Sequence, residues 1–409
     1  MLLAGLLKRI VKRGSLVLID PEGRSHRFGE PGREPDVVIA VRDHGVARRI
    51  FVNPYLALGE AYMDGSLTIE KGSLYNFLDL ISANLGMTDA LPLGRVRRIF
   101  GRLFRSLQQF NPMGRAQRNV AHHYDLSDQL YDLFLDRDRQ YSCAYFETPH
   151  AALEDAQLAK KRHIAAKLLM KPGQKVLDIG SGWGGMGLYL AQTCGADVTG
   201  VTLSHEQLAV SQHRAKEAGL DQSVRFRLED YRNLSGRFDR IVSVGMFEHV
   251  GVPHYPQFFA KVRDLLAEDG VMLLHAIGRS DGPGTTNPWI RKYIFPGGYI
   301  PALSEVLPSI ERMGLMVTDI EILRLHYAET LRHWRQRFLA NLDRVKEIYD
   351  ERFCRMWEFY LAGSEVSFRY GGLMVFQIQL AKSIDAVPLT RDYVGLFEQE
   401  LRRKREIAA

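Results

Sequence analysis

Cysteine is scarce in this chain, and long apolar runs are absent from it. Three cysteines, Cys143, Cys194 and Cys354, lie far apart in 409 residues and include no CxxC pair. This number and spacing argue against a disulfide framework and against a zinc site. Because no apolar run reaches the roughly 20 residues that a membrane-spanning helix needs, we expect a protein of a reducing cytoplasm that does not cross a bilayer.

The composition also lacks the biases of disordered or fibrous proteins. Hydrophobic residues make up 46% of the chain and charged residues 25%, so most of it can fold around a sizeable core. A length of 409 residues suggests two or three domains. Because 54 Lys and Arg face 48 Asp and Glu, the formal charge is +6, which suits an anionic partner without identifying it.

The first 94 residues predict a small α+β domain. Apolar segments at 15–20, 36–41 and 47–53 predict strands separated by stretches rich in Gly, Pro and Asp. Helical spacing of apolar residues follows from 54 to 85, with a break at Asp64 and Gly65. The opening MLLAGLLKRIVKRG has its basic residues after the apolar stretch and no small-residue cleavage site, so we expect it to be retained, unlike a secretory signal.

A basic amphipathic helix is predicted at 95–118, between this domain and the rest. In RVRRIFGRLFRSLQQF (95–110) apolar residues recur at helical spacing beside five arginines. Such a helix can lie in a membrane interface with its cations near lipid phosphates. An interdomain linker with solvated arginines is the equal alternative. The first 13 residues repeat the pattern, and a docked terminal helix explains them equally well.

Residues 119–409 predict a doubly wound α/β domain with a mainly parallel sheet. Continuous apolar strands alternate with helices of 10–15 residues, which is typical of βαβ units covered on both faces. The predicted strands are 175–180, 197–203, 223–230, 238–244 and 270–278, and the predicted helices are 152–170, 185–193, 204–218 and 255–267. An insertion at about 279–335 interrupts the alternation and should sit at the carboxyl ends of the strands, where ligands bind.

A glycine-rich turn, VLDIGSGWGG (176–185), follows the first strand of this domain. Gly180 and Gly182 let a nucleotide ligand approach the backbone, because no Cβ obstructs it. With Gly185 they also satisfy the dinucleotide spacing GxGxxG, so an NAD-dependent reductase is one interpretation. Asp178, directly before the glycines, better suits a ligand with a cationic amino-acid moiety such as S-adenosylmethionine (SAM).

The ends of the next two strands separate these interpretations. An NAD site expects a carboxylate about 20 residues after the glycines to hold the ribose. Thr202, Leu203 and Gln207 stand there instead. The third strand ends near Asp230 and Tyr231, which could receive an adenine. The pattern favours the methyl donor.

Six segments, in order along the chain, resemble the cyclopropane-fatty-acyl-phospholipid synthases, relatives of the mycolic acid cyclopropane synthases. They are HHYDLSDQLYDLFLDRDRQYSCAYF (122–146), VLDIGSGWGG, VTLSHEQ, SVGMFEHVG, LLHAIG and HYAETLRHW. The resemblance covers nearly the whole chain. It implies a Rossmann-like SAM-dependent methyltransferase domain after a small N-terminal domain. The implied reaction is methylene transfer from SAM to the cis double bond of an acyl chain in a membrane phospholipid.

The resemblance also implies site residues. The carbocation left by methyl transfer would lose a proton to a bound bicarbonate ion, held by Cys143, Glu248, His275, the backbone of Ile277, and Tyr327. His, Tyr and Cys can donate hydrogen bonds to such an oxyanion, and a carboxylate can accept one from its hydroxyl. The donor pocket would also include Tyr141 and Ser142. No metal is expected.

A carbocation needs a dry surround, and aromatic faces attract positive charge without acting as nucleophiles. We expect Phe247 and Tyr327, which lie inside motifs, to provide it. Other aromatic candidates are Tyr141, Tyr145, Phe146, Trp289, Tyr293 and Tyr299.

One departure from the resemblance concerns YLAGSEVSF (360–368). Many relatives carry a cysteine there, where this chain has Ser364, so a covalent cysteine mechanism at that position is not expected. Cys354 lies outside the motif and is interpreted as structural.

The expected partner is an anionic phospholipid bilayer with unsaturated acyl chains. We expect the enzyme in the cytoplasm, on the inner face of the cell membrane, without a nucleic-acid partner, and a homodimer is compatible with the sequence. Two alternatives stay open. One is a related lipid methyltransferase that leaves a methyl or methylene branch, and the other is a lipid-binding protein without activity.

Replacing Arg97, Arg98, Arg102 and Arg105 with Gln should weaken binding to anionic phospholipid vesicles and flatten its salt dependence, because these cations would no longer meet lipid phosphates. Co-sedimentation with vesicles at several salt concentrations measures both effects. Unchanged binding would make 95–118 a linker.

Overall fold

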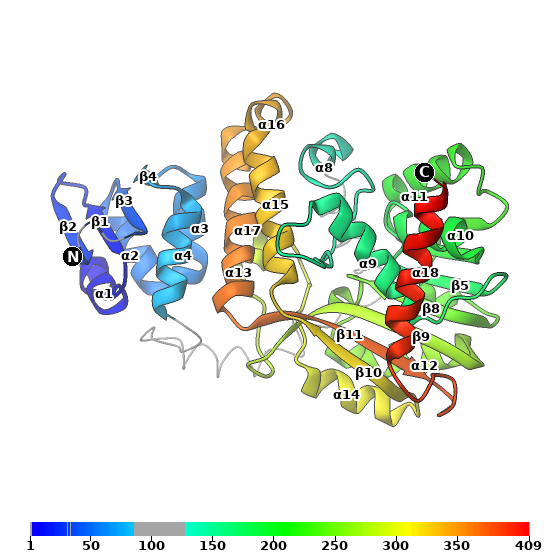
Figure 1. Ribbon diagram of the computed structural model, residues 1–409. Helices are drawn as coiled ribbons and strands as arrows, with labels where there is room; N and C mark the ends of the chain where they lie inside the picture. The colour runs from blue at the N-terminus through cyan, green and yellow to red at the C-terminus, as the bar shows by residue number, and fades with distance from the viewer. Residues whose placement is uncertain (1, 31, 33, 86–126, 409) are drawn as a thin grey trace. The chain divides into compact units, whose positions relative to one another are not determined.

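The computed structural model describes residues 2–30, 32, 34–85 and 127–408 (Figure 1). The predicted amphipathic helix at 95–118 lies outside the described residues. Within the described ranges, no helix is both long and apolar enough to span a bilayer.

The chain divides into two compact units. The first comprises Met1–Arg105, Gly284–Pro296 and Ala328–Leu373, and the second comprises Ser106–Pro283, Gly297–Tyr327 and Met374–Ala409. The predicted division at 1–94, 95–118 and 119–409 was based on sequence order alone. Residues 284–296 and 328–373, which that division gave to the catalytic domain, group with the N-terminal residues by their contacts.

The first unit contains a four-stranded sheet in the order β2-β1-β3-β4. β1 pairs parallel with β3 and antiparallel with β2, and β4 is antiparallel to β3. The strands predicted at 15–20 and 36–41 are β1 and β3. The elements are α1 (Leu2–Ile10), β1 (Ser15–Ile19), β2 (Ser25–Gly29), β3 (Asp36–Val41), α2 (His44–Val52), α3 (Pro54–Met63), β4 (Leu67–Lys71), α4 (Leu74–Leu85), α13 (Pro288–Tyr293), most of α15 (His326–Ala340), α16 (Leu342–Ile348) and α17 (Glu351–Tyr370).

The strand predicted at 47–53 is wrong, because this segment belongs to helix α2. Asp43 caps the helix by accepting a hydrogen bond from the Val46 N–H at 2.8 Å. Val46, Ala47 and Ile50 bury one helical face, and this packing outweighs the strand preference of the β-branched residues. The short strands β2 and β4 were not predicted.

Helices α13 and α17 pack on α3 within the first unit. The buried indole of Trp289 donates a hydrogen bond to Met63 Sδ at 3.3 Å, and its ring centroid lies 4.8 Å from that of Phe359. A Cβ on Gly59 of α3 would lie 2.5 Å from Trp289 Nε1 and 2.9 Å from Phe359 Cε1. Close packing therefore requires glycine at this position.

Gly59→Ala should destabilise the protein by about 1–3 kcal/mol, because two large buried rings would have to shift. Chemical denaturation measures the change. Gly5→Ala is the matched control, since a Cβ there meets nothing within 4 Å, and alanine favours an exposed helix by about 0.5–1 kcal/mol. Equal stabilities of the two variants would contradict the packing argument.

The second unit is built on a seven-stranded sheet in the order β10-β11-β9-β8-β5-β6-β7. The five strands from β9 to β7 pair in parallel, and β10 is antiparallel to β11. The predicted doubly wound α/β fold is thus confirmed. The strands are β5 (Lys175–Ile179), β6 (Asp197–Thr202), β7 (Val224–Leu228), β8 (Phe238–Val244), β9 (Leu266–Arg279), β10 (Met316–Leu323) and β11 (Leu373–Ala381).

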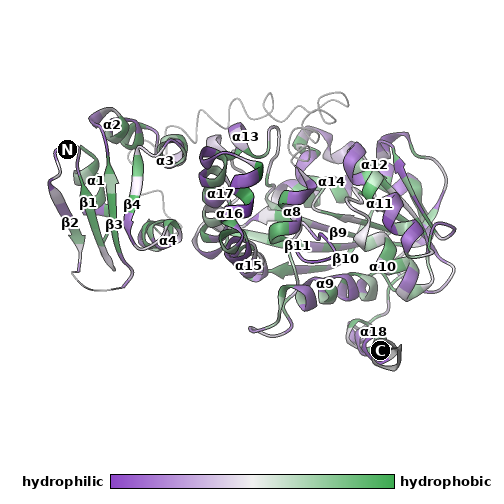
Figure 2. Ribbon diagram, turned by 90° about the horizontal axis from the view of Figure 1, so that it is seen from above, coloured by the Kyte–Doolittle hydropathy of each residue, from purple (hydrophilic) through white to green (hydrophobic). Residues whose placement is uncertain are grey.

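Helices cover both faces of this sheet (Figure 2). One core joins the sheet to residues of α9, α10, α11 and α18, and another joins it to α12 and α14. The helices are α8 (Asp128–Phe134), α9 (Leu153–Lys167), α10 (Gly185–Cys194), α11 (His205–Glu217), α12 (Tyr255–Leu265), α14 (Leu303–Arg312) and α18 (Asp392–Ala408), with short 3₁₀ helices η1 (Tyr231–Asn233), η2 (Phe247–His249) and η3 (Val252–His254).

The order of strands reverses at β5, which has β6 on one side and β8 on the other. Such a switch point opens a crevice at the carboxyl ends of the strands. The insertion after β9 returns to the same edge, where Arg279 bridges to Ala302 and the Tyr299 N–H donates to the Glu248 carbonyl at 2.9 Å.

Candidate active site

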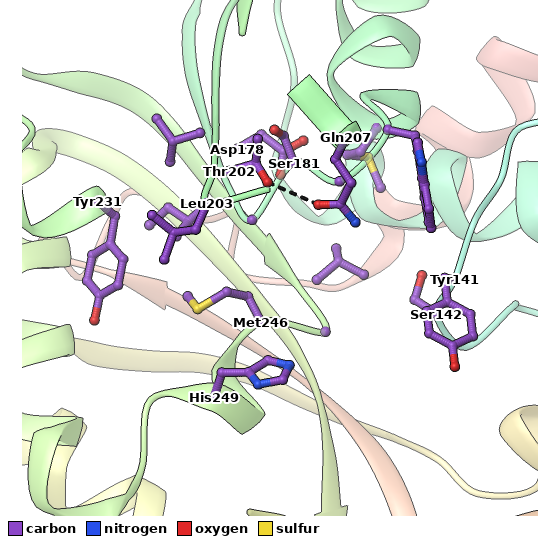
Figure 3. A pocket seen from close by; sticks show the side chains of 18 of the residues that line it. Tyr141, Ser142, Asp178, Ser181, Thr202, Leu203, Gln207, Tyr231, Met246 and His249 are labelled. Carbon is purple, nitrogen blue, oxygen red and sulfur yellow. Dashed lines mark hydrogen bonds between the residues drawn. The ribbon is translucent and has the colours of Figure 1, made fainter. Parts of the chain in front are cut away.

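A pocket lies at the switch point, at the carboxyl ends of β5, β6 and β8 (Figure 3). All the residues predicted to contact the methyl donor line it. They are Tyr141, Ser142, Asp178, Gly180, Gly182, Thr202, Leu203, Gln207, Asp230 and Tyr231. The sequence placed them on four separate segments, and the fold brings them to one cavity.

The turn after β5 depends on glycine. Gly180 has φ 83° and Gly182 has φ 54°, values in the left-handed region that glycine tolerates best. A Cβ on Gly180 would also lie 2.8 Å from the Cβ of Met246. The turn therefore exposes backbone to the pocket and packs against the segment that follows β8.

Asp178 and Ser181 leave polar atoms unpaired in the pocket wall. Asp178 Oδ2 and Ser181 Oγ are buried and have no hydrogen-bond partner among the described residues. Burial raises the pKa of the Asp178 carboxyl to about 7. Buried polar atoms normally have partners, so these two fit a ligand that brings a cation and hydrogen-bonding groups.

The ends of β6 and β7 complete the pocket. Thr202 Oγ1 donates to Gln207 Oε1 at 3.0 Å, which fixes both side chains at the wall (Figure 3). Asp230 is held by the Arg232 guanidinium at 2.9 and 2.6 Å. Tyr231 packs edge-on against Phe258, with ring centroids 5.4 Å apart.

Glu248 lies on η2, between the pocket residues Met246 and His249. Its Oε1 accepts a hydrogen bond from the Ile277 N–H at 2.6 Å, while its buried Oε2 has no hydrogen-bond partner in the described part of the chain. Burial raises the pKa of the Glu248 carboxyl to about 7. A buried carboxyl with one free oxygen beside a cavity is a candidate functional group. The backbone of Ile277, expected to contact an anion, donates its N–H to Glu248.

His275 lies on β9, directly opposite Val244 of β8. Gln377 Nε2 of β11 donates to its Nδ1 at 3.2 Å. Burial, with the positive charges of Lys160 and Lys167 nearby, lowers the pKa of His275 well below its usual value. The ring is therefore neutral and carries its proton on Nε2, from which it can donate to an oxygen.

Cys143 and Tyr327 come from two segments that meet in the second unit. Cys143 is buried, with its Sγ 3.3 Å from the Ala144 carbonyl oxygen. The Phe146 N–H donates to Nδ1 of His326 at 2.9 Å, so the residue next to Tyr327 is bound to the segment of Cys143. The roles of these two residues in catalysis stay predictions.

The aromatic candidates separate. Phe247 is fully buried and stacks on Tyr255 at 4.3 Å between ring centroids, among other core rings, which is a core position. Trp289 and Tyr293 belong to the first unit. Tyr145 is sandwiched between His163 and His326, with ring centroids 4.3 and 4.9 Å apart.

Several pocket residues were not predicted from the sequence, among them Trp183, Met246 and His249. His249 is partly buried, and burial lowers its pKa to about 4. Its place directly after Glu248 was the available signal, but adjacency in sequence does not reveal which side chain faces a cavity.

The pocket has Thr202, Leu203 and Gln207 at the end of β6 where an NAD site has a carboxylate, so it fits the class of SAM-dependent methyltransferases better than an NAD-dependent reductase. A family model described as mycolic acid cyclopropane synthetase matches residues 112–378, and a domain of unknown function (DUF7884) matches 7–88. The chain belongs to the mycolic acid cyclopropane synthetase family.

Individual relatives agree with this assignment. The cyclopropane-fatty-acyl-phospholipid synthase of Escherichia coli (strain K12) is 39% identical over 85% of this chain and 88% of its own. The tuberculostearic acid methyltransferase UfaA1 of Mycobacterium tuberculosis is 36% identical over 92% and 90%.

Solved structures show the same fold. The cyclopropane synthase MmaA2 from Mycobacterium tuberculosis aligns with a TM-score of 0.63 at 35% identity, covering 67% of this chain and 99% of that one. The mycolic acid cyclopropane synthase CmaA1, solved with S-adenosylhomocysteine (SAH) and CTAB, aligns with a TM-score of 0.62 at 35% identity, over 66% and 99%.

Glu248→Gln should gain stability relative to the wild type as pH rises. The unfolded carboxyl ionises at 4.5, whereas the folded one keeps its proton until about 7, so the wild type loses stability through this window. We expect a relative gain of about 1–3 kcal/mol between about pH 5 and about pH 8. Denaturation at both pH values measures it, with the exposed Glu268→Gln as control. A pH-independent difference would contradict the burial of the charge.

Proposed function

We propose that this enzyme transfers a methylene group from SAM to the cis double bond of unsaturated acyl chains in membrane phospholipids, forming cyclopropane fatty acids. The relatives support SAM-dependent cyclopropanation or methylation of lipid acyl chains. The phospholipid substrate and the route to the ring are the parts that go beyond them.

The donor pocket fits SAM by its chemistry. When bound, SAM supplies an electrophilic methyl group. Asp178 would hold the ammonium of its amino-acid moiety, because its buried Oδ2 has no partner among the described residues. The backbone of the glycine turn would approach the ligand closely. Asp230 and Tyr231 would receive the adenosine at the end of β7.

The carboxyl of Glu248 and the neutral ring of His275 form the proposed base site. Bicarbonate, when bound, would supply a weak base for the proton that leaves the new methyl group. Glu248 Oε2 and His275 Nε2 would orient it, with Cys143 and Tyr327 as further donors. Ile277 contributes by fixing Oε1 of Glu248 at 2.6 Å, so the free oxygen stays in place.

One observation carries this proposal. A buried carboxyl with an unpaired oxygen stands between two residues that line the donor pocket. A methyltransferase acting on an oxygen or nitrogen nucleophile needs a base before or during transfer, whereas an alkene needs one only afterwards, for a proton on carbon. A weak, well-placed and desolvated base suits the second case.

We further propose that the enzyme works in the cytoplasm on the inner face of the cell membrane, bound to anionic phospholipid. A net charge of +6 and the basic sequence at 95–110 support this location. A homodimer is part of the same proposal and can be tested by sedimentation.

A methyl- or methylene-branched product is the second candidate. The relative UfaA1, named a tuberculostearic acid methyltransferase, matches 92% of this chain. Both products start from the same carbocation, and the proton that is lost decides between them.

Incubating the enzyme with SAM and vesicles of unsaturated phospholipid tests the function. Mass spectrometry should show the gain of one CH₂ per modified chain, and proton NMR should show upfield cyclopropyl signals. New exocyclic methylene or methyl-branch signals in lipid that has gained CH₂, without cyclopropyl signals, would establish the second candidate, and unmodified lipid would refute both.

In the same assay, Glu248→Gln should lower turnover by about 100-fold or more, since a positioned proton acceptor contributes about 10²–10⁴ in rate. SAH binding by calorimetry should stay near the wild-type value, because Glu248 does not line the donor pocket. Glu268→Gln is the control. Wild-type turnover by the Glu248 variant would remove this residue from the site.

A further inference from the structure

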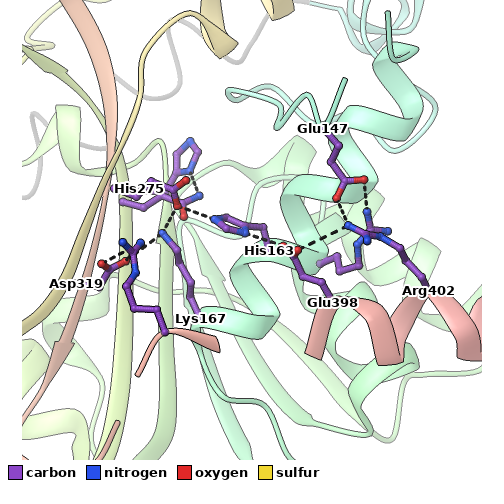
Figure 4. Close-up of polar contacts among 11 residues, drawn as sticks. Glu147, His163, Lys167, His275, Asp319, Glu398 and Arg402 are labelled. Carbon is purple, nitrogen blue, oxygen red and sulfur yellow. Dashed lines mark hydrogen bonds and ion pairs between the residues drawn. The ribbon is translucent and has the colours of Figure 1, made fainter. Parts of the chain in front are cut away.

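Helix α9 carries four consecutive basic residues, Lys160, Lys161, Arg162 and His163, into the protein interior. Their exposed fractions are 0%, 8%, 8% and 5%. Burying a charge costs several kcal/mol unless the charge is paired. Three of the four find carboxylates. Arg162 contacts Glu147, and His163 contacts Glu321 and Glu398 (Figure 4). Lys161 contacts Asp138.

Lys160 is the exception, since no carboxylate of the described residues lies within ion-pairing distance of it. Its Nζ donates to Gln140 Oε1 and to Ser142 Oγ, each at 2.7 Å. From one turn earlier on α9, Gln157 Nε2 donates to the carbonyl oxygens of Gln140 and Ser142 at 3.1 and 3.0 Å. The helix thus holds the segment 140–142 at four points.

This segment is a wall of the donor pocket, because Gln140, Tyr141 and Ser142 all line it. Cys143 follows directly. The ammonium of Lys160 therefore lies behind the wall of the donor pocket. It contacts Ser142, the residue before Cys143 of the proposed base site.

The surroundings of Lys160 join the two sites electrostatically. Its positive charge partly offsets the burial that raises the pKa of Asp178, and it adds to the burial that lowers the pKa of His275. It also interacts with Asp136 and Cys143. Asp138 and Lys161 are the other charges that face it. Burial lowers the pKa of Lys160 itself to about 8, so the group is mainly cationic at neutral pH.

We propose that Lys160 is a positioning residue that holds the segment 140–142 against the bound donor and adds a positive charge that favours the ionised form of Asp178. The inference rests on the proposed use of the pocket for SAM. It explains why a fully buried ammonium is retained without a carboxylate partner. A neutral side chain of the same length would fill the space but would remove the hydrogen bonds to Gln140 Oε1 and Ser142 Oγ.

SAH binding measured by calorimetry from about pH 6 to about pH 8 tests the proposal without requiring turnover. For the wild type, affinity should fall as pH drops through the pKa of Asp178, about 7, because a protonated carboxyl no longer attracts the ammonium of the ligand. In Lys160→Met, affinity at pH 8 should fall about tenfold or more. The midpoint of the pH dependence should also move upward, because the cation that lowers the pKa of Asp178 is gone.

Lys382→Met is the matched control, since Lys382 is largely buried and pairs with the exposed Glu268 away from the pocket. Its affinity and midpoint should equal those of the wild type. If Lys160→Met fails to fold, Lys160→Arg keeps the charge and should retain the wild-type midpoint with a weaker affinity. Wild-type affinity in Lys160→Met, or an unmoved midpoint, would overturn the proposal. Absent lipid modification with these SAH results intact would refute the proposed function alone.

Discussion

The interior of the catalytic unit is organised by the need to pair buried charge. Helix α9 is surrounded by protein, yet its middle turns carry lysine, arginine and histidine rather than apolar residues. The partners come from three parts of the chain: Asp138 and Glu147 from the segment before the helix, Glu321 from β10 and Glu398 from α18. Glu147 and Glu398 are labelled in Figure 4. A helix held only by apolar contacts could slide or rotate at small cost in free energy, whereas these directional hydrogen bonds and ion pairs fix its position. Gln157 and Lys160 of α9 in turn fix the pocket wall formed by residues 140–142.

The same low-polarity surroundings shape the chemistry at the sheet edge. Burial is the largest cause of the raised pKa values of Asp178 and Glu248, and of the lowered pKa values of His249 and His275. The pKa values of both carboxyls are therefore close to 7, and both imidazoles are uncharged at neutral pH. The raised pKa values make both carboxylates stronger bases than they would be in water, because the buried environment disfavours the charged form. The glycine turn and the return of Tyr299 to Glu248 close this edge with backbone contacts rather than with charge.

Much of this could be predicted from sequence, because parallel strands buried on both faces appear as continuous apolar runs, and because the residues after each run meet at one edge. Asp178, Thr202 and Asp230 could be assigned to one pocket on that basis. The helix at His44–Val52 could not, since Ile50 and Val52 favour a strand locally and only packing decides. Lys160 was equally hidden: charged residues on a helix usually face solvent, and nothing in the spacing shows that both sides of α9 are covered. The hydrogen bond from the Ile277 N–H to Glu248 was hidden as well, because a backbone group has no signature in sequence.

The strand order determines when the sheet can be completed during synthesis of the chain. β11 lies between β10 and β9 in the sheet, although it is the last described strand to be synthesised. Until residues 373–381 leave the ribosome, the strand that carries His275 lacks a neighbour along one side, and the imidazole lacks the amide of Gln377. The strand that carries His275 therefore gains its neighbour, and the imidazole its contact with Gln377, only when the last described strand in chain order is in place.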